Sequence, residues 1–192
     1  MSKFNMRQNL NLKNITRDLS LLLASPKDYI FSYSAPRDKI VHFERFDPKA
    51  WQVGRNIVSQ INRIAPGLKV YFVGSVSLKI SGANDIDLIS QCDKYELVKY
   101  AKLLESLLGM PVKRNRGYTI WKTCIKGYSV ELLLSDPNQR FFKEMLKTYL
   151  FLKKNKNVLK EYEELKIKSS GVCEREYIRR RMVFFNKYKL NL

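Results

Sequence analysis

Apolar positions recur at helical spacing in the first third of the chain. Residues 14–24 have a leucine-rich face, and the Ser25-Pro26 dipeptide after them predicts the end of a helix. A second helix is predicted from Pro48 to Ala65, because Pro66-Gly67 then interrupts the pattern. Its apolar side chains fall mostly three or four residues apart, as in a helix that faces a core: Trp51, Val53, Ile57, Ile61 and Ile64.

Strand patterns dominate the middle of the chain. The β-branched and aromatic residues of 68–73 predict a strand that runs directly into Gly74-Ser75, and a short helix is expected from there to Ile80. The other predicted elements of this part are strands at 85–90, 119–125 and 128–134 and an amphipathic helix at 94–108. The turn Lys126-Gly127 joins the last two strands.

The order of these elements indicates an α+β protein. After Asp136-Pro137 the pattern is mostly helical to the end of the chain. We expect three parts: a helical extension with a connection at 1–39, a core at 40–136, and a helical C-terminal part at 137–192 that packs on the core. A chain of 192 residues is long enough to bury such a core.

The net charge favours a polyanionic partner. The chain has 36 Lys and Arg residues against 18 Asp and Glu residues, a formal charge of +18, which exceeds what solubility requires. The basic residues that could follow a nucleic-acid backbone stand in dense runs near the C-terminus or in a polar loop: Lys153, Lys154, Arg179, Arg180, Arg181, Arg114 and Arg116. A compositional bias toward lysine is the alternative, and composition does not decide between the two.

The residue types exclude several kinds of site. Three cysteines lie far apart without a CxxC spacing, which favours reduced thiols in a cytoplasmic protein. His42 is the only histidine, so any catalytic metal must bind oxygen ligands. The longest apolar run near the N-terminus, residues 21–24, is too short to span a membrane.

An acidic pair stands in the predicted strand 85–90. Side chains two residues apart on a strand share a face, so Asp85 and Asp87 would lie side by side while Ile86 points to the core. Two adjacent carboxylates repel each other, and a hard divalent cation such as Mg²⁺ or Mn²⁺ relieves that repulsion by bridging them. The pair is therefore predicted to be a metal site, with a solvated strand edge as the alternative.

A third carboxylate and a phosphate-binding turn complete the predicted site. Glu131 stands between apolar residues on the strand 128–134 and is the expected third ligand, with an ordinary glutamate on the exposed face of a strand as the alternative. Three carboxylates can hold two metal ions, one that activates a hydroxyl and one that binds a triphosphate. Gly74 allows close approach of the backbone to phosphate oxygens, and Ser75 supplies a hydroxyl donor. Lys79 is a further candidate for phosphate contact.

This arrangement resembles the signature of the DNA polymerase β-type nucleotidyltransferase superfamily. Gly-Ser is followed after nine residues by Asp-hydrophobic-Asp-hydrophobic, and then by a carboxylate between hydrophobic residues, over residues 72–133. The resemblance implies a nucleotidyltransferase fold, with a mixed β-sheet flanked by helices and the catalytic core at 40–136. It also implies metal binding by Asp85, Asp87 and Glu131 and triphosphate binding by Gly74 and Ser75.

Within that superfamily, the span from Val41 looks most like the GrpB-like family. The elements that carry this likeness are Asp47-Pro48-x-x-Trp51, Phe142-Lys-Glu-Met-Leu146, Tyr162-x-x-Leu165-Lys166, and Tyr177 with Arg181 and Phe184. GrpB-like proteins often have histidine where Glu131 stands, so this chain has the fuller carboxylate set. Such enzymes place a lysine against the triphosphate on the helix after the core, where Lys143 and Lys147 stand; a solvated cationic face explains these two equally well.

Two classes of function follow from these observations. The first is a metal-dependent nucleotidyltransferase that transfers a nucleoside monophosphate from an NTP to an acceptor, with RNA, and tRNA in particular, as the expected acceptor. The second is a GrpB-like protein that binds nucleotide or nucleic acid, or a toxin–antitoxin component that modifies a protein or is catalytically inactive. The three carboxylates favour the first class, because a protein that only binds nucleic acid has no need of them.

Overall fold

The computed structural model describes residues 38–190. The helix predicted at 14–24 therefore lies outside the described residues. Among the helices of residues 38–190, none combines the length and the apolar composition needed to cross a bilayer.

A five-stranded mixed sheet forms the centre of the structure, in the order β1-β2-β5-β4-β3. The strands are β1 (Lys69–Val73), β2 (Ile86–Gln91), β3 (Lys113–Asn115), β4 (Tyr118–Ile125) and β5 (Tyr128–Ser135). β2 and β5 pair in parallel, and the other neighbouring pairs are antiparallel. The predicted mixed sheet is confirmed, with one addition: the short edge strand β3 forms where the sequence indicated only a polar loop.

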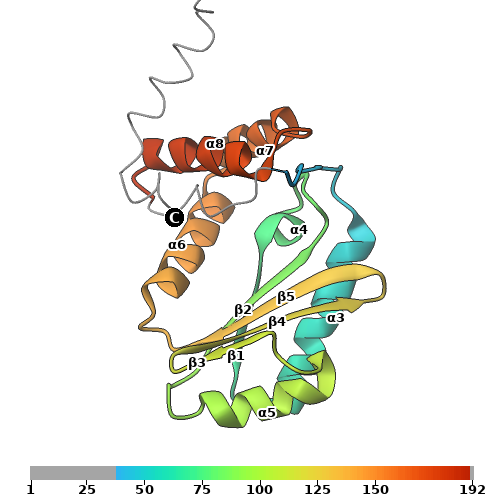
Figure 1. Ribbon diagram of the computed structural model, residues 1–192, viewed down its shortest axis with the longest axis vertical. Helices are drawn as coiled ribbons and strands as arrows, with labels where there is room; N and C mark the ends of the chain where they lie inside the picture. The colour runs from blue at the N-terminus through green and yellow to red at the C-terminus, as the bar shows by residue number, and fades with distance from the viewer. Residues whose placement is uncertain (1–37, 191–192) are drawn as a thin grey trace, which may run out of the picture.

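Six helices accompany the sheet in the described part of the chain. They are α3 (Pro48–Ile64), α4 (Gly74–Leu78), α5 (Leu97–Leu108), α6 (Arg140–Lys154), α7 (Lys156–Lys168) and α8 (Glu174–Lys187). α7 and α8 lie together at one end of the molecule, with α5 at the other (Figure 1). The helix predicted to reach Ile80 ends at Leu78 because Lys79 takes a left-handed conformation, with φ of 58°.

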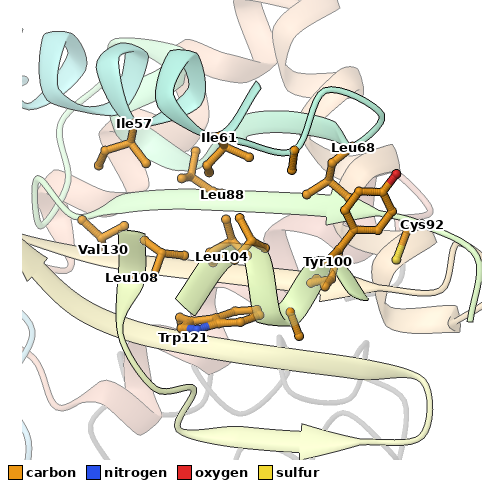
Figure 2. Close-up of a cluster of buried hydrophobic side chains, with 14 of the residues drawn as sticks. Ile57, Ile61, Leu68, Leu88, Cys92, Tyr100, Leu104, Leu108, Trp121 and Val130 are labelled. Carbon is orange, nitrogen blue, oxygen red and sulfur yellow. The ribbon is translucent and has the colours of Figure 1, made fainter. Parts of the chain in front are cut away.

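The main core lies between one face of the sheet and the helices α3 and α5. Figure 2 shows Ile57 and Ile61 of α3 in the same cluster as Leu88, Leu104 and Trp121. The spacing predicted for α3 therefore does place its apolar side chains against the sheet. Burial of such side chains supplies most of the driving force for folding.

The opposite face of the sheet carries a smaller core under α6. Phe142 of α6 is buried with Val73, Ile89 and Leu133, one residue from each of three neighbouring strands. Because successive strand residues point to opposite faces, Leu88 enters the main core while Ile89 faces α6. Asp87 has the same parity as Ile89, so the α6 side of the sheet is the side on which the acidic residues are found.

The C-terminal helices are attached to the core through α7. The carboxylate of Glu163 accepts hydrogen bonds from both the backbone N–H and the hydroxyl of Ser81, each at 2.8 Å. An isolated antiparallel bridge between Glu44 and Gly82, and another between Ile40 and Cys173, tie the entry segment to the same region. The division of the chain at residue 136 stays a prediction.

The attachment of α7 can be tested by removing the carboxylate of Glu163. We expect Glu163→Ala to lower the free energy of unfolding by about 1–3 kcal/mol, because two donors of Ser81 lose their acceptor. Glu164→Ala is the matched control. Glu164 is exposed, and its ion pair with Lys168 of the same helix is long, at 3.8 Å, so its loss should change stability little. Equal destabilisation of the two variants in denaturant unfolding would contradict the proposed role of Glu163.

Candidate active site

The candidate site follows one row of residues across four strands. Val73 pairs with Asp87, Asp87 pairs with Glu131, and Glu131 pairs with Lys122. Directly paired residues of neighbouring strands project to the same face of a sheet. The parallel pairing of β2 with β5 therefore brings Asp87 beside Glu131, although 44 positions separate them in the sequence.

Asp85 lies just outside the strand that was predicted to contain it. β2 begins at Ile86, so Asp85 is the last residue of the preceding loop. Its charge nevertheless acts on Asp87, two residues further along. Asp85 and Glu131 are thus both within electrostatic reach of Asp87.

The environment of Asp87 disfavours a negative charge. Burial, followed by the charges of Asp85 and Glu131, raises the pKa of the Asp87 carboxyl from 3.8 to about 7. Lys166 and Arg181 act in the opposite direction but do not cancel the effect. A carboxyl in such surroundings gains from any further positive charge that comes within reach.

Glu131 is held by a lysine of the neighbouring strand. The Nζ atom of Lys122 lies 2.8 Å from Oε2 of Glu131, and both side chains are well exposed. Between residues 38 and 190, no three His, Cys, Asp or Glu side chains are grouped closely enough to hold a metal ion. Asp87 and Glu131 therefore lie on one row of the sheet, with Asp85 in the loop before it, but the three carboxylates are not assembled around a common point.

The carboxylates still have the chemistry of a divalent-cation site. Mg²⁺ and Mn²⁺ prefer carboxylate oxygens, and burial together with the charges of Asp85 and Glu131 raises the pKa of Asp87, an environment that a nearby cation would relieve. Glu131 is exposed and paired only through an ion pair at the surface, which costs little to break. Asp85, Asp87 and Glu131 thus fit a metal ion by donor type and by charge.

Gly74 is required by its conformation and by its neighbour. Its φ of +72° is in the left-handed region, where glycine is favoured. A Cβ atom at this position would lie 2.0 Å from Oδ2 of Asp87, far inside van der Waals contact. The turn between β1 and α4 therefore places bare backbone directly against the acidic row.

Ser75 contacts a lysine that the sequence analysis did not assign to the site. The ammonium group of Lys166, on α7, donates a hydrogen bond to the Ser75 hydroxyl. Both residues are buried, Lys166 being 5% exposed. The signal was available in the spacing, because Leu159, Tyr162 and Lys166 follow one another at three and four residues and occupy the buried stripe of α7.

The three arginines of the run 179–181 are each partly buried. Arg180 bonds to Glu176 and to the carbonyl oxygen of Lys168, so it links α8 to the end of α7. Arg181 hydrogen-bonds Tyr177 and lies near enough to Asp87 for their charges to interact. Arg179 has a buried Nε atom. Arg181 therefore lies within electrostatic reach of the acidic row, and the assignment of the run 179–181 to nucleic acid stays a prediction.

The remaining predicted cations are dispersed over the structure. The ammonium of Lys79 lies 4.8 Å from the ring centre of Trp51 on α3, and that of Lys153 lies 5.7 Å from the ring centre of Tyr149. Arg114 is paired with Glu105 of α5. The other predicted basic residues are exposed: Arg116, Lys143, Lys147 and Lys154. Their assignments to nucleotide or nucleic acid stay predictions.

Solved structures of larger proteins are similar to part of this chain. A cytoplasmic RNA terminal U-transferase matches over 70% of this chain and 43% of its own, with 16% sequence identity and a TM-score of 0.42. The Cid1 poly(U) polymerase, in a structure with MgGTP bound, matches over 69% and 45%, with 17% identity and a TM-score of 0.40. The chain spans less than half the length of these enzymes. No family model and no curated protein matches the sequence.

The raised pKa of Asp87 predicts a pH-dependent stability in metal-free buffer. The folded protein holds the proton up to about pH 7 and the unfolded chain releases it near 3.8, so the stabilising contribution of protonated Asp87 is lost as the pH rises between these values. Asp87→Asn removes this loss, and we expect it to be more stable than the wild type at pH 8 by a few kcal/mol at most.

Denaturant unfolding at pH 4 and pH 8 measures this effect. The advantage of Asp87→Asn should shrink at pH 4, whereas Asp93→Asn, at an exposed position after β2, should show no such pH-dependent advantage. An advantage that is the same at both pH values would show that the Asp87 carboxyl has an ordinary pKa.

Proposed function

We propose that this protein is a metal-dependent nucleotidyltransferase. The single observation that carries the proposal is the row formed by Asp87 and Glu131 on paired strands, with Asp85 within electrostatic reach and the Gly74 turn against it. Neighbouring carboxylates beside bare backbone suit a site that binds divalent cations together with a phosphate chain. Transfer of a nucleoside monophosphate from an NTP, with release of pyrophosphate, is the reaction that uses both.

Each group of the site has a role in this proposal. Asp85, Asp87 and Glu131 hold Mg²⁺ or Mn²⁺, two ions in the mechanism that the sequence predicts, and the bound metal supplies positive charge where the reaction develops negative charge. Gly74 lets the triphosphate approach the backbone, because any side chain there would collide with Asp87. Ser75 presents a hydroxyl donor to the same phosphates.

RNA is the proposed acceptor, and tRNA the preferred one. The support for this part is electrostatic: a net charge of +18 attracts a compact polyanion, and exposed lysines such as Lys143 and Lys147 are available for backbone contact. Contacts to the phosphate backbone carry no sequence information, so the charge specifies the class of acceptor and not its identity. A cytoplasmic location, also proposed, agrees with the free thiols of Cys92, Cys124 and Cys173.

One observation favours the second class of function, a protein that binds nucleotide without catalysis. Lys122 forms an ion pair with Glu131, and the ammonium group of a lysine at this position can replace the positive charge of a metal ion. The two classes differ in what happens when the ion pair opens. In an enzyme, the Glu131 carboxylate leaves Lys122 and binds the metal ion. In a protein that only binds nucleotide, the ion pair between Lys122 and Glu131 stays intact.

Transfer of labelled nucleotide tests the proposed activity directly. The full-length protein is incubated with Mg²⁺, total RNA and each labelled NTP in turn, and incorporation into RNA is measured. We expect Asp87→Asn to lower incorporation at least about a hundredfold, because the acidic row loses a metal ligand. Asp93→Asn, which removes an exposed carboxylate outside the site, should retain activity. Label that appears equally with wild type and Asp87→Asn would defeat the proposal.

The ion pair between Lys122 and Glu131 predicts competition between the lysine and the metal. Lys122→Met should tighten Mn²⁺ binding by about two- to fivefold, the range expected for an exposed pair. The measurement is the electron paramagnetic resonance signal of free Mn²⁺ during titration of the protein. Lys126→Met, which removes an exposed lysine from the β4–β5 turn, is the matched control. Unchanged affinity in Lys122→Met would show that Glu131 does not contribute to metal binding.

A further inference from the structure

Apolar side chains are exposed on and beside α5, at the end of the molecule opposite α7 and α8 (Figure 1). In the described part of the chain nine large hydrophobic side chains are exposed, and five of them belong to residues 95–112. The other four are spread over the entry segment, α6 and α7. We call the five residues near α5 the α5 patch: Tyr95, Val98, Leu103, Met110 and Val112.

The α5 patch is not needed by the core, because α5 packs on the sheet with its other face. Leu104 and Leu108 lie in the main core beside Trp121 (Figure 2). Val98 and Leu103 lie outside that cluster, so packing does not account for their apolar character. Exposed apolar side chains that gather in one region mark surfaces that contact a partner.

Two hydrogen bonds fix the loop that carries Met110, the residue between α5 and β3 that is 74% exposed. The indole N–H of Trp121 donates to the carbonyl oxygen of Gly109 at 3.0 Å, just before Met110. The backbone N–H of Val112 donates to the carbonyl oxygen of Ile120 at 2.9 Å, just after it. The loop therefore presents the Met110 side chain to the outside from a fixed backbone.

The charges around the α5 patch are mainly positive. Residues 93–116 contain six Lys and Arg residues against three Asp and Glu residues. Two of the three carboxylates are paired within this region, Glu96 with Lys99 at 3.1 Å and Glu105 with Arg114. The remaining basic side chains are exposed and add an excess of positive charge to the patch: Lys94, Lys102, Lys113 and Arg116.

Apolar side chains interspersed with lysines favour a bilayer with anionic lipids over other partners. Nucleic acid would use the cations, but its phosphate backbone gains nothing from the exposed side chains of Val98 and Met110. A protein partner needs a continuous surface of complementary shape, whereas a bilayer accepts each apolar side chain separately. Lysines beside the apolar residues can extend their ammonium groups to anionic headgroups.

We propose that the α5 patch binds peripherally to bilayers that contain anionic lipids. Val98, Leu103 and Met110 enter the boundary between headgroups and acyl chains, while the neighbouring lysines contact the headgroups. α7 and α8 lie at the other end of the molecule and point away from the bilayer (Figure 1). No residue of the acidic row takes part in this contact, so it is independent of the proposed nucleotidyltransferase activity.

Cosedimentation of the full-length protein with sucrose-loaded vesicles tests this contact. One set of vesicles is phosphatidylcholine alone, and the other contains an equal amount of phosphatidylglycerol. We expect binding to be at least about tenfold stronger with the anionic vesicles. Val98→Ser/Met110→Ser should weaken that binding at least about tenfold, because two apolar side chains no longer enter the bilayer. Met145→Ser, which changes an exposed methionine of α6, is the matched control, with an expected effect of about twofold or less.

A second pair of variants tests the position of the charge. Lys102→Gln should weaken binding to anionic vesicles about fivefold at low salt, because Lys102 lies beside the apolar residues of α5. Lys160→Gln removes the same charge from an exposed position of α7, and we expect an effect of about twofold or less.

Three results would overturn the proposal. Unchanged binding of Val98→Ser/Met110→Ser would mean that another part of the chain contacts the vesicles. Equal losses in Lys102→Gln and Lys160→Gln would show that the vesicles respond only to net charge. The third is a wild-type protein that binds neither kind of vesicle. A change of oligomeric state in Val98→Ser/Met110→Ser would then assign the α5 patch to contact with a second copy of the chain.

Discussion

The charge balance around Asp87 is the constraint on which the candidate site depends. Burial and two neighbouring carboxylates raise its pKa to about 7, while Lys166 and Arg181 oppose that rise. The carboxylates belong to β2, β5 and the loop before β2, and the cations belong to α7 and α8. Neither part of the chain contains both the carboxylates and the cations that oppose their charge, so the electrostatics of the acidic row depend on the docking of the C-terminal helices.

A few local features of the fold place the acids and the cations relative to one another. Parallel pairing of β2 with β5 fixes Asp87 opposite Glu131, and the positive φ of Gly74 turns the chain away before a side chain could collide with Asp87. On the helical side, Glu163 holds the N–H and the hydroxyl of Ser81, close in sequence to the Ser75 that Lys166 contacts. Hydrogen bonds from two residues of α7, Glu163 and Lys166, thus position Lys166 relative to the acids.

Strand parity and local spacing carry the information that places Asp87 and Glu131 on one face of the sheet, so this part of the arrangement could be predicted from the sequence. The alternation in β2 and β5 separates Asp87 and Glu131 from the core residues beside them, and Gly74-Ser75 is a local signal. The cationic half depends on long-range contacts. Lys166 resembles any other lysine until α7 is docked, and only its place in the stripe with Tyr162 indicates burial. Arg181 was assigned to nucleic acid because a run of arginines looks solvated in sequence, whereas the structure directs Arg181 inward to Tyr177.

Direct titration of the Asp87 carboxyl is the most decisive measurement. Carboxyl ¹³C chemical shifts, followed by NMR over a range of pH and assigned with Asp87→Asn, report its ionisation with and without Mg²⁺. An acidic row that needs an added cation predicts titration near pH 7 in metal-free buffer and a clear fall of that pKa when Mg²⁺ is present. An Asp87 that titrates near 4 and does not respond to Mg²⁺ would contradict the assignment of this row as a metal-dependent active site.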